Sequence, residues 1–365
     1  IGRLESKGGD KIHEAGFCYD VIAGPTISGH CVVVSLNNEG EIIHLLDKLN
    51  PGTTYYVRAY AKNNLGIAYG NEITFKTPSL SLPTIQLDRE IVGSPVLFGA
   101  IIAAEIMDDG GDKIIETGIC FDINPDPTIE SSEYLKASEL SLTSRYTIKV
   151  EGLQGNSTYY FRSYAKNSIG TAYGETRIIV VDIEGNVYNT IKIGDQVWMK
   201  ENLRTTRFND GLPINNITDD LKWAGPNWTH PLSETVSSVS AYCWYRNDIS
   251  FKYPYGAIYN GYAVLTDKLA PKGWRVPSHK DMEIMLKVID PNLSYEAVTT
   301  SYYTTEIYRS NVAGTRMKSD TVKNWNGTNE SGFSALPAGF RQDWGYFENT
   351  EILPGMAQPP MVDYH

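Results

Sequence analysis

The feature that most constrains this chain is a repeat of about one hundred residues in its first half, a length typical of one β-sandwich domain. The string GGDKI at residues 8–12 returns at residues 110–114, and residues 49–72 return with small changes at residues 153–175. Both copies consist of short alternating runs of apolar and polar residues, separated by Gly, Pro, Asn and Asp. This pattern predicts two consecutive β-sandwiches, at residues 1–78 and 79–182.

A tyrosine sits at the same place in both copies. Leu49, Pro51, Thr53 and Tyr55 have the spacing of the tyrosine corner in fibronectin type III modules, and Tyr159 holds the same position in the second copy. In such a corner the phenol hydroxyl bonds back to the backbone and fixes a strand crossover. The sequence therefore resembles two immunoglobulin-like or fibronectin type III-like modules.

The strand after each corner carries a row of polar aromatic and basic side chains on one face. Tyr56, Arg58, Tyr60 and Lys62 alternate with smaller residues, and residues 160–166 repeat the same types. The row could form a contact surface for a partner. We favour packing of cations and aromatic rings on a solvated sheet face, because both copies share it.

The first copy is shorter at its start than the second. Only seven residues precede Gly8, whereas residues 83–109 precede Gly110. We expect the first sandwich to lack its first strand and most of its second. A piece of a longer chain is the favoured explanation, and a strand donated by another chain is the alternative.

The four cysteines do not have the spacing of a zinc site or of a dense disulfide framework. Cys18 and Cys120 occupy equivalent strand positions, where we expect buried thiols. A Cys18–Cys31 bridge is possible, but we disfavour it because the second copy offers Cys120 no matching partner.

One acidic loop of the second copy has oxygen-bearing residues at the positions of a calcium-binding loop: Asp122, Asn124, Asp126, Glu130 and Glu133. Pro127 stands where such a loop needs glycine for its sharp turn. An acidic turn between strands is the favoured interpretation, and calcium is the alternative.

Three sequence segments after residue 182 together carry a family resemblance. They are NVYNTIKIGDQVWMKENLRTTRFNDG at 186–211, GWRVPS at 273–278 and SGFSALPAGFR at 331–341. They resemble the Fibrobacter succinogenes major paralogous (FISUMP) domain, which occurs in secreted and surface proteins of Bacteroidetes-like bacteria. The resemblance implies a C-type-lectin-like α+β domain over residues 183–365. Ala270 stands where the family usually has cysteine, so Cys243 is expected to be a buried free thiol.

Two local elements of this region can be predicted. Residues 187–193 and 196–199 flank a Gly194–Asp195 turn and predict a β-hairpin. Ser278 and Asp281 have the spacing of a capping box, and apolar residues follow at helical intervals. We therefore expect a helix from 279 to 289.

The composition and the absence of certain motifs disfavour several classes of function. The formal net charge of −11 and the isoelectric point of about 5.1 disfavour nucleic acid and anionic lipid as partners. No apolar run is long enough for a membrane-spanning helix. The sequence has no nucleophile elbow, HExxH motif or phosphate-binding loop, so we expect a protein that is not an enzyme.

The best candidate for ligand binding is the loop at residues 219–231, with Trp223, Asn227, Trp228 and His230. Sugar sites pair an aromatic face with amides and charged groups, because C–H groups pack on the ring while hydroxyls need fixed polar partners. The alternative is that both tryptophans fill the domain core.

These observations predict a mainly β protein of three parts, two sandwiches followed by the lectin-like domain. The predicted function is non-catalytic adhesion, with a glycan or a surface protein as the ligand. Its expected place is extracellular or at the outer-membrane surface, reached through a signal or lipid anchor outside this chain. The alternative is a structural component of a surface or fimbria-like assembly.

Overall fold

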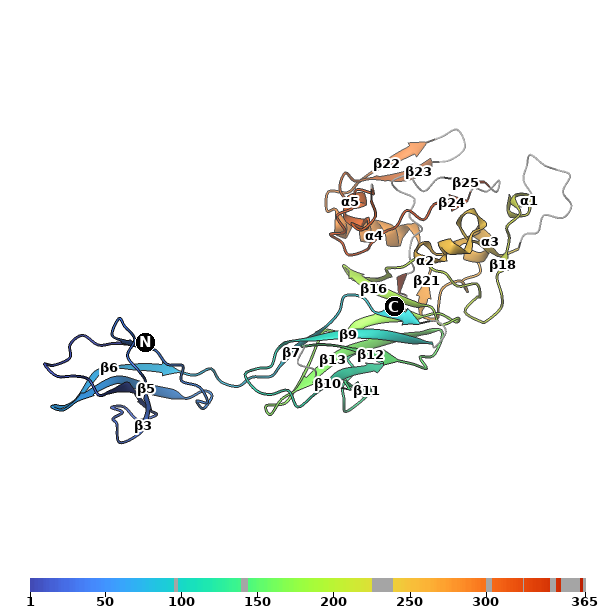
Figure 1. The fold of residues 1–365 in the computed structure, drawn as a ribbon. Coiled ribbons are helices and arrows are strands. Elements are labelled where there is room, and N and C mark those ends of the chain that lie inside the picture. The colour runs from blue at the N-terminus through green and yellow to red at the C-terminus, as the bar shows by residue number, and fades with distance from the viewer. Residues whose placement is uncertain are drawn as a thin grey trace. The chain divides into compact units, whose positions relative to one another are not determined.

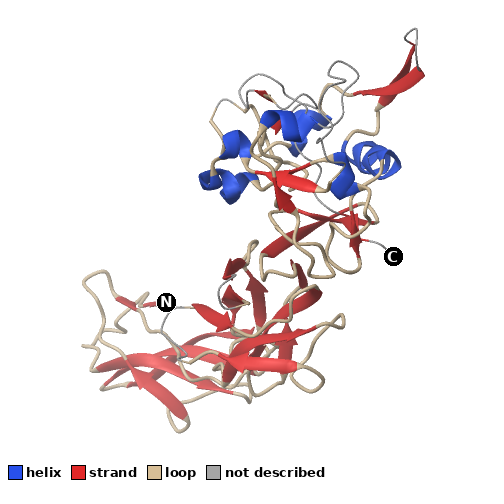
Figure 2. Cartoon of the chain, turned by 90° about the vertical axis from the view of Figure 1, so that its right-hand side faces the viewer, coloured by secondary structure: helices blue, strands red, loops and turns tan. Residues whose placement is uncertain are grey.

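The computed structural model describes residues 1–94, 98–138, 144–224, 239–299, 304–323, 325–341, 346–348 and 362–363. The fold is mainly β, as predicted, and the described helices all lie after residue 219 (Figures 1 and 2). The chain divides into two compact units. Unit 1 comprises Ile1–Thr84, Asp108–Ile115 and Lys166–Ala172, and unit 2 comprises the rest. No boundary between units falls at residue 182.

The first sandwich has one well-formed sheet and one short one. The larger sheet has the order β3-β2-β5-β6, from β2 (Glu14–Asp20), β3 (His30–Val33), β5 (Thr54–Asn63) and β6 (Gly66–Lys76). The other sheet consists of β1 (Gly2–Arg3) and β4 (Glu41–Ile42). The hydrophobic cluster of this module is small, with three buried members, Ala15, Phe17 and Ile42.

Cys18 and Cys31 form a disulfide, so the expectation of a free Cys18 thiol is wrong. The two residues lie directly opposite each other on β2 and β3, with their Cα atoms 4.1 Å apart. In the second module Tyr134 takes the place opposite Cys120. Cys120 and Cys243 are buried free thiols, and burial raises their pKa values to about 12 and about 11.

Breaking this disulfide is expected to destabilise unit 1 alone. The bridge closes a loop with a sequence separation of 13, and a loop of this size contributes about 3 kcal/mol by restricting the unfolded chain. Calorimetry with and without a reductant should show the unit 1 transition moving to lower temperature, as should Cys31→Ser. A reductant effect confined to unit 2, where both cysteines are thiols, would contradict this.

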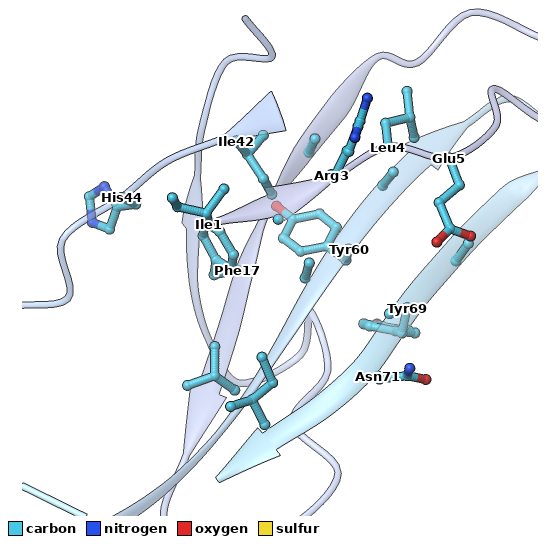
Figure 3. A pocket seen from close by; sticks show the side chains of 18 of the residues that line it. Ile1, Arg3, Leu4, Glu5, Phe17, Ile42, His44, Tyr60, Tyr69 and Asn71 are labelled. Carbon is cyan, nitrogen blue, oxygen red and sulfur yellow. The ribbon is translucent and has the colours of Figure 1, made fainter. Parts of the chain in front are cut away.

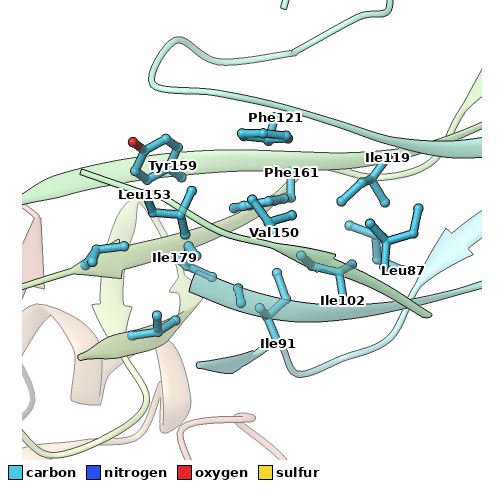
Figure 4. Close-up of a cluster of buried hydrophobic side chains, with 14 of the residues drawn as sticks. Leu87, Ile91, Ile102, Ile119, Phe121, Val150, Leu153, Tyr159, Phe161 and Ile179 are labelled. Carbon is cyan, nitrogen blue, oxygen red and sulfur yellow. The ribbon is translucent and has the colours of Figure 1, made fainter. Parts of the chain in front are cut away.

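The second module has two sheets, and Figure 4 shows buried side chains of the core that they form. One sheet contains β7 (Thr84–Leu87), β8 (Val92–Ser94), β9 (Gly99–Asp108) and β12 (Arg145–Val150). The other contains β10 (Glu116–Asp122), β11 (Glu133–Lys136), β13 (Ser157–Lys166), β14 (Thr171–Tyr173) and β15 (Arg177–Val181). Side chains from both sheets meet in one core, in which the Phe121 and Phe161 rings stack 5.5 Å apart.

Both tyrosine corners are confirmed. The Tyr55 hydroxyl accepts a hydrogen bond from the Asn50 amide at 3.0 Å, and the Tyr159 hydroxyl accepts one from the Gln154 amide at 2.9 Å. In the polar aromatic row, the expectation of a solvated face is wrong for Tyr60 and Tyr164, which are 3% and 0% exposed. The packing of cations on rings is confirmed, since Arg58 lies 4.6 Å from the ring centroid of Tyr69 on the neighbouring strand β6. The equivalent Arg162 lies 4.8 Å from that of Tyr173.

The C-terminal region begins with the predicted hairpin, formed by β16 (Val187–Ile193) and β17 (Gln196–Met199). This hairpin extends the second sheet of the sandwich, because β16 pairs with β15. On the other side β17 pairs with β26 (Val362–Asp363), which pairs with β21 (Trp274–Arg275). A separate small sheet has the order β18 (Asn215–Asn216), β19 (Ala241–Cys243), β20 (Ile258–Tyr259).

The remaining described elements also belong to the C-terminal region. They are α1 (Asp220–Ala224), η2 (Tyr245–Asn247), η3 (Ile249–Phe251), α2 (Lys252–Tyr255), α3 (Gly261–Val264), α4 (His279–Ile289), β22 (Ser294–Thr299), β23 (Thr304–Arg309), α5 (Ala313–Met317), β24 (Phe340–Arg341) and β25 (Phe347–Glu348). The predicted helix is confirmed as α4, with Ser278 and Asp281 forming the capping box. Arg275 also binds Asp281 and holds the pKa of that carboxyl well below its usual value. None of the described helices is long and apolar enough to cross a membrane.

Candidate functional site

The second sandwich and the C-terminal region share their hydrophobic cores. β15 and β16 pair antiparallel at three positions, from Ile179↔Asn189 to Val181↔Val187. Val187, on the C-terminal side, is buried in the sandwich core. Val180, on the sandwich side, is buried among the C-terminal core residues with Tyr188 and Trp274. Each part therefore completes the core of the other.

An asparagine also stabilises this joint, the β15–β16 contact between the second sandwich and the C-terminal region. The Asn189 side chain accepts a hydrogen bond from the Ile91 amide at 2.8 Å and donates one to the Ile91 carbonyl at 3.0 Å. Glu201 in turn accepts bonds from the Asn189 amide and side chain, at 2.7 and 2.8 Å. Burial raises the pKa of Glu201. The side chain of Asn189 thus links β16 to the segment before β8, a strand of the sandwich's other sheet.

A buried carboxylate, that of Asp182, accepts hydrogen bonds within the turn that connects β15 to β16. Asp182 is buried and accepts bonds from the Asn186 side chain at 2.8 Å and from the Tyr188 hydroxyl at 2.7 Å. Burial raises the pKa of Asp182 although these bonds oppose the effect. Arg204 lies 4.4 Å from the Tyr188 ring centroid and donates to the Val187 carbonyl at 2.6 Å. These contacts give the joint a defined geometry.

Close backbone packing and a cross-domain bond complete the joint. A Cβ atom added to Gly93 would lie 2.5 Å from the Cβ of Val187, so only glycine fits there. The indole nitrogen of Trp274, on β21, donates to the Thr158 hydroxyl of β13 at 2.9 Å. The sequence indicated the hairpin but gave no sign of these contacts, because they join residues far apart along the chain.

The predicted binding loop is described only in part. Trp223 is 8% exposed and packs with Cys243, Tyr245 and Ile258, while the Arg341 guanidinium lies 4.6 Å from its ring centroid. Its ring face is therefore covered by protein, as the core alternative expected, and it does not offer a platform for a sugar. Asn227, Trp228 and His230 lie outside the described residues, so their part in binding stays a prediction.

The acidic loop does not gather its oxygens at one point. Asp122 accepts bonds from the Asn124 amide and side chain at 2.9 and 3.0 Å, while Asp126 accepts one from Thr176 at 3.2 Å. Glu133 lies in β11 opposite Phe121. Among the described residues no three acidic, histidine or cysteine side chains form a group that could hold a metal ion. The loop has the geometry of the favoured alternative, an Asx turn between strands.

A hollow with a volume of about 720 Å³ lies in the first sandwich (Figure 3). Phe17, Ile42 and Tyr60 line it beside Ile1. The register Gly2↔Ile42 matches Ala104↔Tyr146 of the second sandwich, where β7, β8 and the rest of β9 occupy the corresponding place. Phe75 pairs with Tyr55 and is 36% exposed, whereas the equivalent Ile179 is fully buried. The hollow therefore corresponds in position to the part of the second sandwich that β7, β8 and the rest of β9 fill.

Comparison with known proteins finds a match between part of this chain and one family model. Residues 191–352 match the family model of the Fibrobacter succinogenes major domain. The curated proteins contain no match. Among solved structures, the FN1–FN3 domains of chicken CNTN1 match with a TM-score of 0.19 and 18% identity, over 45% of this chain and 53% of that one. The chain thus spans about half the length of that structure.

Proposed function

Since residues 191–352 carry a Fibrobacter succinogenes major domain, we propose that this is an exported, non-catalytic binding protein. The family domain carries the binding surface for a glycan or a surface protein, and the sandwiches act as spacers. The second sandwich sets the orientation of that domain. Extracellular or outer-membrane placement belongs to the same proposal.

The joint between the second sandwich and the family domain is the observation that carries this proposal. A flexible linker would be enough if the two parts acted independently. Instead, Val187 of the C-terminal region is buried in the sandwich core, and Val180 of the sandwich is buried in the C-terminal core. Asn189 also links β16 to Ile91 of the sandwich. Burial of this kind fixes the direction in which a surface of the family domain faces. Such fixed orientation is useful to a protein that presents a binding surface.

The Cys18–Cys31 disulfide supports export. Disulfides persist in secreted and cell-surface proteins and are rare where thiol reductants are abundant. The bridge joins neighbouring strands of a module that has a small core, so it supplies stability that the core does not.

The proposal is tested with the full chain on an array of immobilised neutral and anionic oligosaccharides, combined with affinity capture from surface-protein extracts. We expect saturable binding to one class of ligand, with no chemical change in that ligand. Capture of stoichiometric partner chains without any saccharide signal would instead favour the structural-assembly alternative. Turnover of a bound saccharide would contradict the non-catalytic part of the proposal.

A further inference from the structure

Two adjoining crevices lie on either side of Arg316 in the C-terminal domain. The larger has a volume of about 470 Å³ and is lined by Asp290, Asn292, Ser294, Ser310, Asn311 and Arg316. The smaller, of about 310 Å³, lies between Lys192–Gly194 of the hairpin end and Glu330–Ser331. The larger crevice falls within the range of about 300–1,000 Å³ typical of small-ligand sites. None of these residues belongs to the Trp223 loop or to the joint.

Hydrogen bonds fix the walls of the larger crevice. Asp290, which ends α4, is 6% exposed and accepts bonds from the Asn292 amide at 3.0 Å and the Ser310 hydroxyl at 2.6 Å. The Ser310 hydroxyl also accepts a bond from the Ala313 amide at 2.8 Å. One buried carboxylate thereby ties the end of α4 to the segment between β23 and α5. The exposed side chains of Asn292, Ser294 and Asn311 stand on these fixed segments.

Arg316 lines both crevices, and its side chain is fixed by two polar contacts. Its guanidinium donates to the Ile289 carbonyl at 2.7 Å, and its Nε lies 3.0 Å from the Glu330 carboxylate. Lys192 and Arg316 are balanced by Asp290 and Glu330, so the lining has no excess charge of either sign. A ligand with a formal charge would gain little from such a surface, because attraction to one wall is offset at another.

We propose that the larger crevice binds an uncharged pyranose unit of a glycan. A polyhydroxylated ring needs donors and acceptors close together, and side-chain amides and hydroxyls supply both. Asn292 and Asn311 provide the amides, Ser294 provides a hydroxyl, and Pro291 and Val312 provide apolar contact for the C–H face of the ring. Arg316 donates to ring hydroxyls from the side that Glu330 leaves open. This inference rests on the proposed function and names its site and ligand class.

Strand β16 connects the crevices with the sandwich. Its first residue, Val187, is buried in the sandwich core, and its last, Ile193, lines the smaller crevice. A strand of seven residues spans roughly 20 Å, since each residue advances the chain by about 3.3 Å. The strand that packs the domain against the sandwich thus extends to the smaller crevice, which adjoins the proposed site.

The experiment compares the full chain with three variants on the oligosaccharide array, followed by calorimetric titration with the neutral oligosaccharide that binds best. Asn292→Ala combined with Asn311→Ala removes both amides from the crevice. Asn38→Ala removes an exposed amide from the first sandwich and is the matched control. Trp228→Ala tests the loop at residues 219–231. We expect binding to neutral saccharides, an affinity loss of about tenfold or more in the double variant, and unchanged affinity in Asn38→Ala.

The outcomes separate the inference from the proposed function. Unchanged affinity in the double variant, with the unfolding temperature also unchanged, overturns the crevice as the site while glycan binding stands. Loss of affinity in Trp228→Ala alone has the same consequence and moves the site to the loop. Binding restricted to anionic saccharides overturns the ligand class. An array with no signal overturns the glycan form of the proposed function and the inference with it.

Discussion

Asn189→Ala should lower the free energy of unfolding of unit 2 by about 3 kcal/mol, because its loss leaves buried polar groups unpaired. The Asn189 side chain is the partner of both the amide and the carbonyl of Ile91, which is 4% exposed. It also donates to Glu201. For a unit of this size the change corresponds to an unfolding temperature lower by about 6–12 °C.

Tryptophan emission is a suitable probe for this variant, because all seven tryptophans lie at or after residue 198. Asn311→Ala is the matched control: it removes an exposed amide from the same unit and should change stability by less than about 0.5 kcal/mol. Equal stability of the two variants would show that Asn189 does not hold the joint. A shift in the unit 1 transition, followed by calorimetry because unit 1 contains no tryptophan, would show that the substitution acts outside the joint.

The isolated family segment, residues 191–352, should fail to fold cooperatively. It begins within β16, so it lacks Val187 and Tyr188 and has no β15 to pair with. Tyr188 is fully buried in the C-terminal core, and Val180 of the sandwich is buried beside it. Exposing these positions to water leaves an apolar surface and an unpaired strand edge, which together favour aggregation.

A fragment covering residues 79–365 is the control, since it keeps the sandwich, the joint and the family domain. It should give a single sharp thermal transition, whereas residues 191–352 should give a broad one with dye-accessible apolar surface. A sharp transition in the short fragment would show that the family domain is independent. The core sharing would then be a contact between two domains that already fold alone.

Local signals in the sequence predicted local structure well. The capping box at Ser278 and the apolar spacing after it predicted a helix from about 279 to 289, which is α4, because both signals come from residues a few positions apart. The Gly194–Asp195 turn located the hairpin, and the spacing around Tyr55 and Tyr159 predicted both corners. In each case the residues that interact are close together in the sequence.

Contacts between residues far apart in the sequence could not be predicted from it. Cys18 and Cys31 are opposite only because of the register of β2 and β3, which spacing alone does not give. The link between Ile91 and Asn189 spans 98 positions. The two crevices are lined by residues from α4, α5 and the end of the hairpin, which are likewise far apart in the sequence. Trp223 illustrates the converse, since a tryptophan in a polar loop sequence is buried beneath Arg341, which lies far along the chain.

The shared sheet also has a consequence under mechanical load. A surface protein that holds a ligand is pulled between its anchor and that ligand, and a flexible connection would let its two ends rotate freely under tension. Here a pull on the C-terminal domain passes through the β15–β16 pairs and the buried Val180 and Val187 into the sandwich. Tension therefore has to break backbone pairing and open two cores together before the two parts can separate. We expect the joint to yield only with the unfolding of unit 2.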